Sequence, residues 1–127
     1  MRYATVSPMA GREAVREQHR RGRIAAQPMR TRYPDLASLK LDFGFKDRTD
    51  FIPSPQVTEF HPPAPAYFCF ACPYSDCSGE FNLTSIADLA VSSREPKSSG
   101  QLCCTGTRHR GVACTLNLEY SISPQWL

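Results

Sequence analysis

Four of the six cysteines form two pairs whose spacing suits a metal ion. Cys72 and Cys77 have four residues between them, and Pro73 stands at the start of the intervening turn. Thiolates separated by two or four residues on a tight turn can bind one ion together. Cys104 and Cys114 follow as a second pair. Four thiolates complete the tetrahedron of Zn²⁺, so the sequence predicts a closed, structural zinc site without catalytic activity.

Other ligand sets remain open from the sequence. Cys69 and Cys72 have the commoner two-residue spacing, but side chains three positions apart in an extended strand point to opposite faces. Four residues also separate Cys104 from His109, which makes His109 an alternative ligand. The thiols could instead be buried apolar side chains. Disulfides are less compatible with the sequence, because nothing else in it indicates a secreted protein.

The positive charge of the chain is concentrated at its N-terminus. Residues 1–33 contain eight arginines and two glutamates, whereas residues 34–127 are mildly acidic. Few large apolar residues accompany the arginines, so we expect a basic, disordered tail over residues 1–33 and a single globular domain over residues 34–127. A start of translation at Met9 or Met29 is a further interpretation of this segment.

A helix is the alternative to disorder in the N-terminal segment. If residues 11–26 were helical, four arginines would line one face, namely Arg12, Arg16, Arg20 and Arg23. Such an arm could bind nucleic acid or an acidic protein through its charge alone.

The globular part has the pattern of a small α+β domain, mostly β. Leu39, Leu41, Phe43 and Phe45 alternate with polar residues or glycine, which predicts a strand with one buried face. A second alternation predicts the longest strand, with inward residues at Val112, Cys114, Leu116, Leu118, Tyr120 and Ile122. Ser85 and Asp88 have the spacing of a capping box, so we expect Ser85 to cap one short helix, with Asp88 as the capping acid. The segments rich in proline before residue 66 favour edge strands and loops.

The sequence contains no run of 18 apolar residues, which a membrane span would require, and the N-terminus lacks the apolar stretch of a secretory signal. We therefore expect a cytoplasmic protein that does not associate with membranes. In that reducing compartment, clustered cysteines indicate metal or redox chemistry more often than disulfides.

Residues 67–122 together resemble a zinc ribbon. The features that carry the resemblance are the turn from Cys72 to Cys77, the expected strand at residues 80–83, and the second cysteine pair that leads into a long strand. The resemblance implies two facing hairpins that hold one zinc ion. The chain departs from the usual pattern in the longer spacings within both pairs and in its surplus cysteines, Cys69 and Cys103.

Two classes of function follow from these residues. A binding or adaptor module would present a surface such as the loop Arg108, His109 and Arg110, where two arginines could hold a phosphate or carboxylate of a protein or nucleic-acid partner. A thiol redox enzyme or sensor would use Cys69 with Cys72, or Cys103 with Cys104. The sequence contains no nucleophile-elbow, metalloprotease or P-loop motif. We therefore expect binding rather than catalysis.

Overall fold

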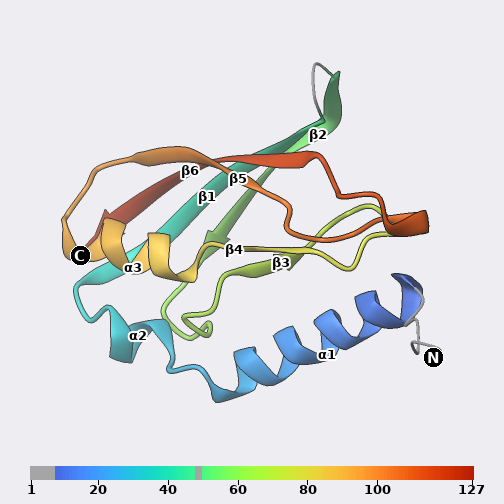
Figure 1. Cartoon of the computed structure of the whole chain (residues 1–127). Helices are drawn as coiled ribbons and strands as arrows, with labels where there is room; N and C mark the ends of the chain where they lie inside the picture. Colours follow the sequence, from blue (N-terminus) through green and yellow to red (C-terminus); the bar gives the residue numbers. More distant parts are fainter. Residues whose placement is uncertain (1–7, 48–49) are drawn as a thin grey trace.

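The computed structural model describes residues 8–47 and 50–127, and it has an α+β fold made mostly of strands (Figure 1). The main sheet is antiparallel, with the strand order β2-β1-β6-β5. Its strands are β1 (Leu36–Asp47), β2 (Asp50–Phe60), β5 (Ser98–Cys103) and β6 (Leu116–Trp126). A separate hairpin pairs β3 (Cys69–Ala71) with β4 (Glu80–Asn82). The helices are α1 (Pro8–Ala25), α2 (Met29–Arg32) and α3 (Thr84–Ser92). The fold class predicted from the sequence is confirmed.

Strands β1 and β6 form the centre of the main sheet, although they stand far apart in the chain. Their registers bring Leu41 opposite Ile122 and Phe45 opposite Leu118. The alternating apolar residues of both strands are buried, with Leu39, Leu41, Leu118 and Ile122 each at most 2% exposed. The alternation predicted for these two strands is therefore confirmed, except that β6 begins at Leu116 and Val112 is 59% exposed in the preceding loop.

Strand β2 occupies an edge of the sheet and pairs only with β1 among the described strands. It includes Pro53 and Pro55. Proline has no amide hydrogen, so it is tolerated where one side of a strand has no neighbour. In this part of the proline-rich region, the structure thus has one edge strand from Asp50 to Phe60.

Residues 8–33 differ from the expected disordered tail, because the structure places them in two helices against the rest of the chain. Helix α1 lies beside β3 (Figure 1), and its His19 is only 3% exposed. Met29 and Tyr33 belong to the hydrophobic core. Helix α1 is held against the rest of the chain by polar contacts to residues far away in the sequence, such as the bond between His19 and Glu80. It has no strong apolar stripe of its own that a sequence pattern would reveal.

Helix α3 begins at Thr84, so its N-cap is Leu83 rather than the expected Ser85, and it buries Ala87 and Ala90. The amide of Thr84 donates to Oδ1 of Asn82, at 2.9 Å. Asp88 does not act as a capping acid, because its carboxylate accepts hydrogen bonds from Arg32 and Tyr33. No helix in the described part of the chain is long and apolar enough to cross a membrane.

Candidate metal centre

The four paired cysteines lie in two hairpin loops at the same end of the molecule (Figure 1). Residues 72–79 connect β3 to β4 and contain Cys72 and Cys77. Residues 104–115 connect β5 to β6 and contain Cys104 and Cys114. We call these the first and the second cysteine loop. Antiparallel pairing within each hairpin brings the two ends of its loop together, so each loop holds its own two cysteines close to each other.

The four sulfur atoms form a compact, buried group. The Sγ atoms of Cys77 and Cys104 are 3.6 Å apart, and those of Cys72 and Cys114 are 3.9 Å apart. All four lie within 4.8 Å of one another. A tetrahedral ion with metal–sulfur bonds of about 2.3 Å requires sulfur–sulfur distances of about 3.8 Å. The observed spacing therefore fits one ion at the centre of the group. The fold brings together the four cysteines that the sequence spacing predicts as ligands.

The two loops share a local motif that holds a sulfur in place. The amide of Gly79 donates to Sγ of Cys77 at 3.3 Å, and the amide of Gly106 donates to Sγ of Cys104 at 3.4 Å. Each glycine carbonyl then accepts the amide of the other cysteine in its loop, at 3.0 Å in both cases. The motif is Cys-x-Gly, present as Cys77-Ser78-Gly79 and Cys104-Thr105-Gly106. Its repetition is a sequence signal of the site that the spacing of the cysteines alone does not reveal.

Both glycines are required by the close approach of the two loops. A Cβ atom on Gly79 would overlap Sγ of Cys104 and lie 2.8 Å from the backbone nitrogen of Gly106. A Cβ atom on Gly106 would lie 2.7 Å from Sγ of Cys77. The loops therefore contact each other through backbone atoms, and this contact brings the sulfur atoms within reach of one ion.

Burial and hydrogen bonding shift the pKa values of the thiols in opposite directions. Burial raises the pKa of Cys72 well above its ordinary value and raises the pKa of Cys104 to about 12. Burial also acts on Cys77, but hydrogen bonds from the Gly79 amide and from neighbouring thiols outweigh it and lower the pKa. Four buried thiolates would repel one another strongly, so a cation at the centre is needed for all of them to ionise.

A cross-link of polar side chains joins the two cysteine loops outside the sulfur group. Arg108 of the second loop donates to Asp76 of the first, from Nη2 at 2.9 Å and from Nε at 3.1 Å. Its guanidinium also lies over the ring of Tyr74, 4.0 Å from the ring centre. The Tyr74 hydroxyl donates in turn to Asp47 of β1, at 2.6 Å. These contacts fix the relative position of the loops.

Helix α1 is attached directly to the first cysteine loop. Nη1 of Arg12 donates to the carbonyls of Cys72 and Tyr74, at 2.6 and 2.5 Å. Gly11 packs close to Ser78, because a Cβ atom on it would lie 2.9 Å from the Ser78 Cβ. The N-terminal segment thus supports the loop that carries two of the four sulfur atoms.

The remaining candidate residues lie outside the sulfur group. Sγ of Cys69 is 3.8 Å from the Thr84 hydroxyl. Cys103 is exposed. His109 is also exposed, and its backbone amide donates to Asp76. In the predicted patch of residues 108–110, Arg108 already pairs with Asp76, so a ligand at this loop would compete with that carboxylate.

Comparison of the chain with protein-family models, with curated proteins and with solved structures gave no match.

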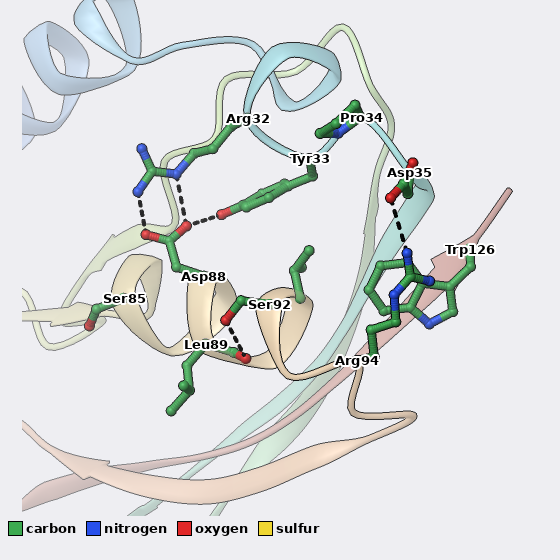
Figure 2. Close-up of a pocket in the computed structure, with 11 residues that line it drawn as sticks. Arg32, Tyr33, Pro34, Asp35, Ser85, Asp88, Leu89, Ser92, Arg94 and Trp126 are labelled. Carbon is green, nitrogen blue, oxygen red and sulfur yellow. Dashed lines mark hydrogen bonds and ion pairs between the residues drawn. The ribbon is translucent and has the colours of Figure 1, made fainter.

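A surface hollow of about 700 Å³ lies at the opposite end, between α2, α3 and the end of β6 (Figure 2). Arg32 donates to Asp88, which also accepts a hydrogen bond from Tyr33. Arg94 donates to Asp35 at 3.0 Å and lies over the Trp126 ring. The four charged side chains of this hollow thus form two pairs. Their contacts join the helices to the C-terminal strand, and we do not assign a ligand to this hollow.

Proposed function

We propose that the chain binds one zinc ion through Cys72, Cys77, Cys104 and Cys114. The observation that carries the proposal is the buried group of four sulfur atoms, two of whose separations match the edges of a zinc–thiolate tetrahedron. The amides of Gly79 and Gly106 support it, since hydrogen bonds to sulfur stabilise thiolates. An iron–sulfur cluster binds its thiolates through several iron atoms, which this compact group does not suit.

The proposed site is structural. Four protein ligands leave no open position for water or substrate. The ion would hold the β3–β4 hairpin against the loop between β5 and β6, as in a zinc ribbon. The facing hairpins support this likeness, while the longer spacings within both cysteine pairs set the chain apart from the usual ribbon.

The function that follows is that of a small binding or adaptor module whose shape depends on the metal. It would operate in a reducing compartment such as the cytoplasm, where thiolates remain available to the ion. The ion would determine the position of the first cysteine loop, and through Arg12 the position of α1 as well.

The test is the metal content of protein purified without a metal-affinity tag, measured by elemental analysis beside a count of free thiols. We expect one zinc per chain, with reactivity confined to the thiols outside the site. Replacement by Co²⁺ should give the intense thiolate-to-cobalt absorption of a four-sulfur tetrahedral site. One iron per chain would change the metal but keep the site. Absence of metal with six reactive thiols would refute the site.

A strong chelator provides the second measurement. Structural zinc contributes about 10–16 kcal/mol of apparent binding energy in small domains, which equals or exceeds the total stability of a typical domain. We therefore expect the chelator to unfold the cysteine loops and to lower Tm strongly, with recovery on addition of Zn²⁺. A Tm that does not respond, together with oxidation to disulfides, would favour the redox alternative instead.

A further inference from the structure

A second hollow, of about 670 Å³, lies between α1 and the strands that it crosses. We call it the α1 groove. One wall is the helix, the floor comes from β1 and β3, and Gln56 of β2 contributes at the side. Its volume is in the range of small-molecule sites. It does not include any of the four sulfur-group cysteines.

The helical wall of the α1 groove carries three arginines, Arg16, Arg20 and Arg23. Residues spaced by four and three positions lie on one face of a helix, so these side chains stand in a row along the groove. Arg20 is bonded to Glu17. Within the described residues, Arg16 and Arg23 are exposed and have no hydrogen-bond or ion-pair partner. Two guanidinium groups are thus available to an anion.

The floor of the α1 groove is aromatic. Phe43 and Phe70 stack with ring centres 5.4 Å apart, and Phe45 packs edge-on against Phe43 at 5.8 Å. Phe45 and Phe70 are only partly buried. These rings offer a flat ligand an apolar surface and favourable ring contacts. The sequence places the rings far from the arginines, and only the fold brings the two groups together.

Two further polar groups of the groove have partners of their own. His19 is bonded to Glu80, and the Cys69 thiol lies beside the Thr84 hydroxyl. Glu13 and Glu17 also line the groove, so its side chains include two carboxylates beside three arginines. Hydrogen bonds from Arg20 lower the pKa of Glu17 to about 2, so it stays charged at neutral pH. This balance suits a ligand with one negative charge.

We propose that the α1 groove binds a small acid with a flat apolar body, the chemistry of an aromatic carboxylate. The carboxylate would accept hydrogen bonds from Arg16 and Arg23, whose guanidinium forks match its geometry. The aromatic body would lie on Phe45 and Phe70. The two carboxylates of the helix would repel successive phosphates, so the groove suits a single acid better than a nucleic-acid strand. This inference goes beyond the zinc site and does not depend on which ion is bound.

The test uses full-length, metal-loaded protein and three probes: 2-naphthoate, the neutral 2-naphthalenemethanol and acetate. Calorimetry should show saturable one-site binding of 2-naphthoate, at least about tenfold weaker binding of the neutral analogue, and none of acetate. Amide chemical shifts should change around residues 16–23, 43–45 and 69–71. Equal binding of the neutral and charged probes, or no saturable binding of 2-naphthoate, would overturn the proposal.

Variants distinguish binding in the α1 groove from nonspecific attraction to the positive charge of the protein. Arg16→Gln with Arg23→Gln should weaken 2-naphthoate binding at least about tenfold. Arg30→Gln with Arg110→Gln removes the same charge outside the groove and should leave binding unchanged. Ala71→Phe keeps every arginine but fills the groove, and it should also abolish binding while circular dichroism and metal content stay unchanged. Equal losses in both arginine pairs would contradict the site.

A short single-stranded oligonucleotide completes the experiment. We expect it to bind more weakly than 2-naphthoate and without dependence on Arg16 and Arg23. Tighter binding that is lost in the Arg16→Gln, Arg23→Gln variant would assign the groove to nucleic acid and reject the small acid. Since metal content is measured in each sample, failure of the groove and failure of the zinc site would be distinguished.

Discussion

The two cysteine loops reach the same sulfur geometry with different lengths of chain. The first loop spans residues 72–79 and the second residues 104–115. Both contain a Cys-x-Gly motif with the same pair of hydrogen bonds. The second loop adds a 3₁₀ turn at His109–Gly111, in which Arg110 and Gly111 have positive φ. Two loops of different length thus hold one sulfur atom each with the same motif.

The largest effect should come from the cysteines that the motif positions. Cys77→Ser and Cys104→Ser each remove one ligand from equivalent places, so both should lose tightly bound metal and lower the free energy of unfolding by more than about 4 kcal/mol. Cys103→Ser, at an exposed neighbour, is the control and should change stability by less than about 0.5 kcal/mol. Metal analysis and thermal melts test this. A stable, metal-loaded Cys104→Ser would show that the loops are not equivalent.

The glycines test the contact between the loops. Alanine at Gly79 or Gly106 would place a Cβ against a sulfur and the backbone of the other loop, so each should destabilise the protein by at least about 3 kcal/mol. Gly111 has a φ of +74° but open space around it, and its alanine variant should cost only about 1–2 kcal/mol. Denaturant unfolding of the three variants provides the comparison. Equal costs at all three positions would mean that conformation, not the close approach, requires the glycines.

The smallest effect should come from the ion pair that crosses between the loops. Arg108→Ala or Asp76→Ala should lower Tm by a few degrees at most, because both side chains are partly exposed to solvent. A double-mutant cycle should give a coupling that weakens in high salt. Hydrogen bonds from Arg108 lower the pKa of Asp76. The stabilisation by this ion pair is therefore present at neutral pH and is lost as the pH falls through the lowered pKa of Asp76. A coupling that persists at low pH would contradict this assignment.

The parts of the fold that the sequence predicted depend on local patterns. The alternation from Leu39 to Phe45 determines which face of β1 is buried, and Pro53 and Pro55 restrict β2 to an edge. The spacing of Cys72 and Cys77 alone predicts that their thiols converge. Each of these features requires only a few neighbouring residues, which is why a pattern could predict them.

The remaining features depend on residues that meet only in the folded chain. Helix α1 lacks a strong apolar stripe, and its position depends on Arg12 at two carbonyls and on His19 at Glu80. No local pattern encodes these contacts, so composition alone predicts disorder for this segment. The alternation also predicts Val112 in the last strand, but Val112 is exposed in the loop that carries Cys114, before the strand begins at Leu116.

The pairing of β1 with β6 also constrains the order in which the chain can fold during its synthesis. The ribosome releases β1 and β2 early, but β1 lacks its central partner until residues 116–126 have emerged. Both cysteine loops lie between these strands in the sequence, so two thiols are available to an ion before the other two exist. Contacts between distant segments slow folding and leave strand edges open to other chains. If the proposed site binds zinc, an ion captured first by Cys72 and Cys77 would restrict the nascent chain during that interval and would link metal supply to the yield of folded protein.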